Sequence, residues 1–188
     1  RGRHGIKIEG RQKDAEYVAS AVGGYRRWLD SIERGVPDRE ALGGDLGKMA
    51  LAYSRGFSRG FLEGSDHQTL VDGRYPKHRG VFLGQVTGVA GDEVSVTAAP
   101  GSLEPRAGMG VVFDDGHPET QEAGGPIFTV TRGGAGWRLG FGRPGPDLAR
   151  VAAGQRVWIT GDPALQREAA RLVNGPEPDG GHPLELVV

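Results

Sequence analysis

The spacing of apolar residues changes along this chain, from intervals of three and four in the first third to intervals of two after Val81. The first pattern predicts a helix from Asp14 to Arg34, with Asp14 as its N-cap and Gly35 as its stop. Glycines 23 and 24 in its middle indicate close packing against a neighbour. One face of this helix collects the apolar residues Val18, Ala21, Val22, Tyr25, Trp28, Leu29 and Ile32.

Two weaker elements surround this helix. The alternation in Gly5 to Gly10 predicts a short strand before it, whose apolar face has no partner nearby in the sequence. A second helix is predicted from about Asp45 to Tyr53, separated by Gly43 and Gly44 from whatever precedes it.

The period-two pattern predicts six short strands, and hence a small barrel or sandwich. Short turns at 90–92 and 133–136 favour hairpins, so we expect mainly antiparallel pairing. Asp162 and Pro163 predict the start of a last helix over 164–173. The strands are predicted at Val81 to Val89, Glu93 to Ala98, Met109 to Phe113, Ile127 to Thr131, Trp137 to Phe141 and Arg156 to Thr160.

The chain begins on a strand-like run and ends on another, Leu184 to Val188. The residues before that end, Asn174 to Pro183, are rich in Gly and Pro and are typical of a linker. We therefore expect a segment of a longer protein, of α+β class.

Composition narrows the function classes. The 188 residues include 34 Gly and no Cys, which predicts many turns and excludes disulfides, thiolate nucleophiles and cysteine-ligated metal centres within this chain. The 23 basic and 24 acidic residues nearly cancel, so binding of nucleic acid needs a local patch. The sequence has no signal-peptide core and no apolar run of roughly 20 residues. We expect a cytoplasmic protein with no membrane contact.

Lys7, Glu9 and Arg11 are the candidate catalytic residues. Alternation places Lys7 and Glu9 on one side of the predicted strand, and Arg11 follows its end. Charged groups at the C-terminal end of a strand that leads into a helix are typical of α/β-barrel active sites. The same pattern equally fits a solvated edge strand with a structural ion pair.

The stretch between the helices and the strands is basic and aromatic. Such residues can follow a nucleic-acid backbone and stack on bases, although the acidic residues Glu63, Asp66 and Asp72 make an interdomain contact at least as good an interpretation. The candidate substrate-binding residues are Arg55, Arg59, Arg74, Tyr75, Lys77, His78 and Arg79.

Two further patterns are better explained without a ligand. Gly140, Gly142 and Gly145 fit the dinucleotide motif, but prolines flank the third glycine where a helix should start, so a hairpin exit is favoured. Asp114-Asp115 with His117 could bind a metal, yet a solvated turn after a strand has the same composition and is favoured. We predict no metal site.

Several longer motifs stand out along the chain: Lys7-Ile8-Glu9-Gly10-Arg11, Glu16-Tyr17-Val18, Tyr25-Arg26, Ser54-Arg55-Gly56-Phe57, Arg74-Tyr75-Pro76-Lys77-His78-Arg79-Gly80 and Asp162-Pro163-Ala164-Leu165. Together they resemble one known family, peptidase family U32, the collagenase-like peptidases. More narrowly, they resemble its long bacterial members, which include a hydroxylase of large-subunit ribosomal RNA.

The resemblance implies a division of the chain. Residues 1–62 would be the last strand and helices of a catalytic TIM-type α/β barrel, 63–80 a basic link, 81–173 an accessory antiparallel β-barrel with a short terminal helix, and 174–188 a linker and the start of a following domain. The cysteine signature of the family is missing here, so the segment should not be active alone. An iron or iron–sulfur centre is left open for the upstream barrel, and no cofactor is expected within this segment.

Three hypotheses about function follow. In the first, the full protein hydroxylates a base of ribosomal RNA, with Lys7, Glu9 and Arg11 at the mouth of the active site and the β-barrel seating RNA. In the second, the full protein is a peptidase acting on collagen-like or other peptides, and the β-barrel binds the substrate. In the third, the segment is a scaffold and interaction unit. The upstream barrel is the expected intramolecular partner in each enzymatic case.

Overall fold

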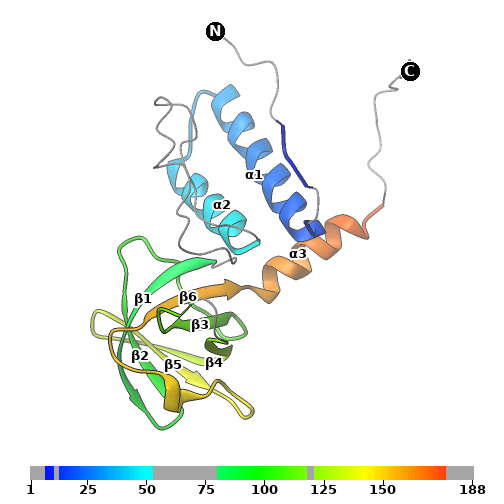
Figure 1. The fold of residues 1–188 in the computed structure, drawn as a ribbon. Helices are drawn as coiled ribbons and strands as arrows, with labels where there is room; N and C mark the ends of the chain where they lie inside the picture. The colour runs from blue at the N-terminus through cyan, green and yellow to red at the C-terminus, as the bar shows by residue number, and fades with distance from the viewer. Residues whose placement is uncertain (1–6, 11–12, 53–79, 118–120, 177–188) are drawn as a thin grey trace.

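The computed structural model describes residues 7–10, 13–52, 80–117 and 121–176. These residues form an α+β structure in which three helices lie against one end of a small barrel (Figure 1). The elements in chain order are α1 (Ala15–Glu33), α2 (Arg39–Ala52), β1 (Val81–Ala90), β2 (Glu93–Ala98), β3 (Gly110–Asp114), β4 (Ala123–Gly133), β5 (Gly136–Phe141), the 3₁₀ helix η1 (Leu148–Arg150), β6 (Arg156–Gly161) and α3 (Pro163–Val173).

The six strands close into a barrel with the order β1-β2-β5-β4-β3-β6 and antiparallel pairing throughout. All six predicted strands are present, and β4 extends furthest beyond its predicted ends. The alternation of the sequence places one apolar row inside, where Leu83, Val94, Leu139, Val157 and Ile159 are fully buried. A closed sheet has no exposed edge, so the strands pair their backbone hydrogen-bonding groups with one another and their inward-facing side chains pack together.

Closure of the barrel depends on Gly84 in β1. A Cβ atom at this position would lie 1.7 Å from the carbonyl oxygen of Thr97 on β2. The pairing of β1 with β6 also shifts register between Phe82 and Gly84. The missing side chain therefore lets two backbones approach at a point where the sheet bends.

The first helix follows the prediction. Asp14 caps α1 and accepts a hydrogen bond from the Tyr17 amide at 2.9 Å, and Gly35 follows the helix with φ 73°. The close packing expected around glycines 23 and 24 is found at Gly24, where a Cβ would lie 2.4 Å from the Met49 methyl group on α2.

The prediction for the second helix was wrong about its start, because α2 begins at Arg39 rather than near Asp45. The side chain of Asp38 accepts hydrogen bonds from the Glu40 and Ala41 amides, both at 3.0 Å. This cap and the packing against α1 stabilise a helix that continues across Gly43 and Gly44, although two glycines alone would favour a break there.

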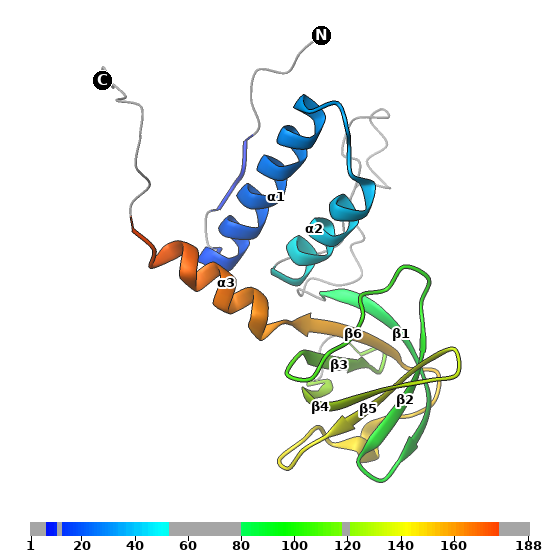
Figure 2. The same ribbon diagram turned by 180° about the vertical axis from the view of Figure 1, so that it is seen from behind.

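The last helix, α3, continues directly from β6 and lies against the start of α1 (Figure 2). Asp162 Oδ1 accepts a hydrogen bond from the Ala164 amide at 2.8 Å, as predicted for an N-cap. The other carboxylate oxygen, Oδ2, forms an ion pair of 2.6 Å with Arg106. Leu165 of α3 and Leu51 of α2 are buried in the same apolar cluster as the barrel interior. Helices and barrel thus share one core.

The TIM-type part of the fold expectation is not confirmed. Residues 7–10 have no strand assignment, and Ile6 of the predicted strand lies outside the described residues. A strand needs a neighbour to pair with, and every strand pair among the described residues is used to close the small barrel. The expected boundary at residue 62 also lies outside the described part. Within that part, no helix is both long and apolar enough to cross a membrane.

Candidate functional site

The N-terminal charged residues are described only in part. Lys7 Nζ and Glu9 Oε2 lie 3.6 Å apart, so the two side chains share one side as predicted. Both are well exposed, with 86% and 65% of the side chain accessible. An exposed pair of this kind contributes little to stability, so the two groups present polar surface next to the start of α1. Arg11 lies outside the described residues.

The basic link lies outside the described residues as well. Its candidate residues are Arg55, Arg59, Arg74, Tyr75, Lys77, His78 and Arg79, which all fall within 53–79. Their role in substrate binding stays a prediction from the sequence.

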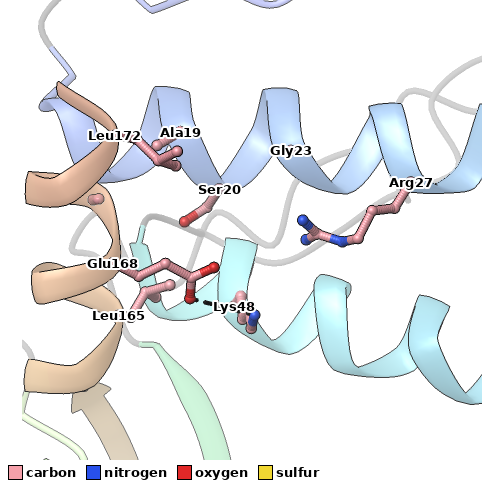
Figure 3. Close-up of a pocket in the computed structure, with 9 residues that line it drawn as sticks. Ala19, Ser20, Gly23, Arg27, Lys48, Leu165, Glu168 and Leu172 are labelled. Carbon is pink, nitrogen blue, oxygen red and sulfur yellow. Dashed lines mark ion pairs between the residues drawn. The ribbon is translucent and has the colours of Figure 1, made fainter. Parts of the chain in front are cut away.

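The three helices enclose a small cavity of about 40 Å³ (Figure 3). Ser20 and Gly23 of α1, Lys48 of α2, and Leu165 and Glu168 of α3 line it. Lys48 Nζ and Glu168 Oε2 form an ion pair of 3.5 Å across its rim. Substrate pockets usually enclose roughly 300 Å³ or more, so this cavity is much too small to hold a nucleotide or a large side chain of a peptide.

The hydroxyl of Ser20 gives the cavity its polar character. Ser20 is buried, with 8% of its surface exposed, and its Oγ has no hydrogen-bond partner among the described residues. A buried hydroxyl without a partner is costly, and a cavity of this size can hold a water molecule. The arrangement fits a hydrated joint between three helices, and it offers no nucleophile–base pair.

Beside this joint, Arg27 of α1 binds Asp45 of α2. The Arg27 Nε donates to both carboxylate oxygens, at 3.1 and 3.0 Å, and a guanidinium NH2 group also donates to Oδ1. This hydrogen bonding raises the pKa of Arg27 above its usual value, partly offset by burial of the guanidinium. Asp45 is almost fully buried, so the pair fastens α2 to α1 and leaves no free acid there.

A cluster of three carboxylates lies where the sequence suggested a possible metal site, but it contains Glu122 in place of His117. Asp114, Asp115 and Glu122 bring their oxygens within 4.8 Å of one another, and His117 is not among them. Asp114 Oδ1 accepts from the Gly116 amide and Asp115 Oδ1 from the His117 amide, each at 2.9 Å. These bonds are typical of the predicted turn.

Arginines neutralise the same acidic turn. Arg156 lies 3.1 Å from Asp114 Oδ2, and Arg150 lies 3.8 Å from Asp115 Oδ2.

The glycine motif also proves to be structural: Gly140 is within β5, and only the three-residue η1 follows the motif, so no helix N-terminus faces the glycines. The interpretation as a hairpin exit is consistent with this geometry.

A different surface was not anticipated from the sequence. Phe128 of β4 is 71% exposed on the outside of the barrel. Elsewhere on the outside of the barrel, Thr87, Ser95, Thr97 and Arg138 line an open polar groove of about 210 Å³. The sequence signal was available, because Ile127 and Val130 are three residues apart and break the alternation of the strand. The prediction of a regular five-residue strand, Ile127 to Thr131, missed this irregularity.

Comparison with known proteins places these features in context. Residues 1–72 match the sequence model of peptidase family U32. The tRNA hydroxylation protein P of Haemophilus influenzae is 34% identical over 90 residues, which cover 46% of this chain and 19% of that protein. The protein of the same name from Escherichia coli K12 is 32% identical over 100 residues, covering 52% of this chain and 21% of that protein. The aligned part is about a fifth of each relative's length.

Proposed function

We propose that this chain is part of an RNA-modifying protein that hydroxylates its substrate. The family match over residues 1–72 and both relatives support membership of peptidase family U32. The observation that carries the proposal is the similarity to two proteins named for tRNA hydroxylation. Their names favour tRNA as the substrate, whereas the family resemblance alone led us to expect ribosomal RNA.

Within this protein, the described residues would position and bind rather than react. The buried carboxylates among them are Asp45, Asp114 and Asp162. Arginines on other elements pair with all three: Arg27, Arg156 and Arg106 respectively. A buried acid that is neutralised in this way is committed to structure and is poorly suited to exchange protons with a substrate.

The reacting groups therefore belong, in this proposal, to a barrel supplied by another part of the longer protein. If thiolates hold an iron or iron–sulfur centre in that protein, they must come from outside this chain, which has no Cys. Lys7, Glu9 and Arg11 would stand at the edge of that site, and the basic link would contact RNA. We place this activity in the cytoplasm, where RNA substrates are available.

The test is nucleoside mass spectrometry of purified tRNA and ribosomal RNA from a strain that lacks the full-length gene. We expect one hydroxylated nucleoside to disappear from tRNA and to return when the wild-type gene is restored. Loss from ribosomal RNA instead would change the substrate class. Unchanged profiles in both RNAs would overturn the proposal.

Complementation with variants tests the proposed edge of the site. Glu9→Gln with Lys7→Met should lower the modified fraction, while Arg171→Gln on the exposed side of α3 should restore it fully.

The family name also suggests a peptidase, so the purified full-length protein should be incubated with gelatin. Cleavage of gelatin together with unchanged RNA profiles would favour peptidase activity over RNA modification.

A further inference from the structure

A β-bulge turns one large aromatic residue outward from the barrel. Ile127 of β4 pairs with Phe141 of β5, but the next pair is Thr129 with Gly140, so Phe128 is the extra residue between them. Ile127 is buried inside, whereas Phe128 and Thr129 are both exposed. An extra residue of this kind re-aims side chains, and such bulges are over-represented next to functional sites.

The space beside the Phe128 ring is left open by a glycine. A Cβ at Gly142 would lie 3.6 Å from the ring, which is ordinary van der Waals contact. Gly142 therefore lies beside the ring without covering it with a side chain, and Phe128 stays 71% exposed. The neighbouring residues on the same outer face, Thr129, Thr131 and Gly140, are small or polar and add no apolar patch around the ring.

Arginines lie on the same hairpin. Arg138 of β5 pairs across the ladder with Thr131, and its ion pair with Glu93 is long, at 3.9 Å. Arg132 pairs with Trp137 and lies 5.2 Å from the centre of its ring, so its side chain is on the opposite face from Arg138. An exposed ion pair as long as that of Arg138 with Glu93 is weak, so the Arg138 guanidinium can exchange its carboxylate for a phosphate.

The polar groove continues this face toward β2. The hydroxyl residues Thr87, Ser95 and Thr97 lie along it, and Arg138 belongs to its lining. From Arg138 to Gly142, which lies beside the Phe128 ring, is four residues along the strand direction, or roughly 13 Å at 3.3 Å per residue. One short single-stranded segment can therefore reach both the groove and the aromatic ring.

We propose that the outer face of β2, β5 and β4 binds single-stranded RNA, with a base stacked on Phe128 and a phosphate held by Arg138. This inference rests on the proposed function only for the choice of RNA as the ligand. A single aromatic beside hydroxyl groups and an arginine fits a nucleic-acid strand, whereas a protein partner would need a contiguous apolar patch of several hundred Å². In both ribbon views β2 and β5 lie on the side away from α1 and α2, so the docked helices leave this face open (Figures 1 and 2).

The test is fluorescence anisotropy of the 188-residue chain with a labelled single-stranded RNA of mixed sequence, about 12 nucleotides long to suit a barrel of this size. Phe128→Ala should weaken binding by about 5- to 150-fold, the equivalent of one stacked base. Phe128→Trp should restore it. Arg138→Gln should weaken binding and reduce the slope of log affinity against log salt by about 0.7.

Matched controls come from α3, where Leu172→Ala removes another exposed apolar side chain and Arg171→Gln another exposed cation. Both should bind like the wild type, and circular dichroism should show every variant folded. Equal affinity of wild type and Phe128→Ala, or tighter binding of a duplex than of the single strand, would overturn this inference. Neither result would alter the nucleoside profiles that test the proposed function.

Discussion

The barrel and the helical layer bury their apolar residues to very different extents. Large side chains of the barrel, such as Leu83, Leu139 and Ile159, have no exposed surface. In α1 the buried residues are the small ones, Ser20, Ala21 and Gly24. Large apolar residues remain exposed on the helical layer, by 39% to 65%: Val18, Val22, Leu29, Ile32, Val173 and Leu172.

The difference follows from topology. A closed sheet buries its inner row against itself, whereas a helix needs a second surface for its apolar stripe. The helical layer borrows part of that surface from the barrel through Leu51 and Leu165. Val18 and Val22 of the remaining stripe, with Leu172 and Val173 of α3, line an open apolar groove of about 660 Å³ between α1 and α3. The barrel should therefore be the stable part of the chain and α1 the part that opens first.

The largest expected effect is on the barrel itself, from Gly84→Ala. The new Cβ would collide with the Thr97 carbonyl, so β1 and β2 must separate and lose bonds such as that from the Ala99 amide to the Leu83 carbonyl, 2.8 Å long. We expect a loss of more than about 3 kcal/mol in the free energy of unfolding, measured by denaturant titration.

Gly88→Ala is the matched control on the same strand, because a Cβ at that position meets nothing within 4 Å. It should change the free energy of unfolding by less than about 1 kcal/mol. Similar losses in the two variants would mean that the close approach of β1 to β2 at Gly84 does not explain the effect, since the lower entropy of the unfolded chain favours alanine at both positions.

The helical layer should be most sensitive at Arg27. Arg27→Met leaves the carboxylate of Asp45 buried without its partner, which should cost about 1 to 3 kcal/mol. Arg26→Met is the control, since Arg26 forms an exposed pair with Asp30 one turn along α1 and its loss should change the free energy of unfolding far less. Chemical denaturation followed by circular dichroism at helical wavelengths distinguishes the two, and equal losses would contradict a structural role for Asp45.

Hydrogen exchange on the whole chain tests the comparison without substitution. Amides of α1 should be at least tenfold less protected than those of the barrel strands, a difference of about 1.4 kcal/mol or more. The sample must be monomeric, because a second copy could cover the apolar stripe. Equal protection of α1 and the strands in such a sample would show that the helical layer needs no further partner.

The smallest expected effect concerns Glu16 and pH. Partial burial, and then the charges of Asp14 and Asp162, raise the pKa of Glu16 in the folded chain. The folded state thus holds this proton more tightly than the unfolded state does, so stability falls as pH rises from the ordinary value of about 4.5 through the raised pKa.

Glu16→Gln should therefore stabilise the chain slightly near neutral pH, by an amount that solvent screening keeps small because Glu16 is partly exposed, with the gain vanishing below about pH 4. Glu40→Gln, in the exposed first turn of α2, shares the helix-dipole position and should give no such gain. Thermal unfolding at several pH values measures both variants. A gain for Glu16→Gln that persists unchanged at pH 3 would exclude the proposed cause.

Local sequence signals predicted much of the fold. The caps at Asp14 and Asp162, the stop at Gly35 and the six strands were all found where the pattern placed them, because each depends on neighbouring residues. The start of α2 was missed, since its cap at Asp38 and its packing on α1 outweigh the two glycines. The candidate residues of the link lie outside the described part and remain predictions.

What the sequence determined by itself is the type of each element and the row of side chains that each one buries, because periodicity and capping act over a few residues. Tertiary structure decided which distant residues meet. The pairing of Arg27 with Asp45 and of Arg106 with Asp162, the entry of Leu51 into the barrel core, and the outward turn of Phe128 at a bulge all depend on how the strands close and where the helices dock. No local pattern specifies such contacts, because their energy exists only once both partners have been brought together.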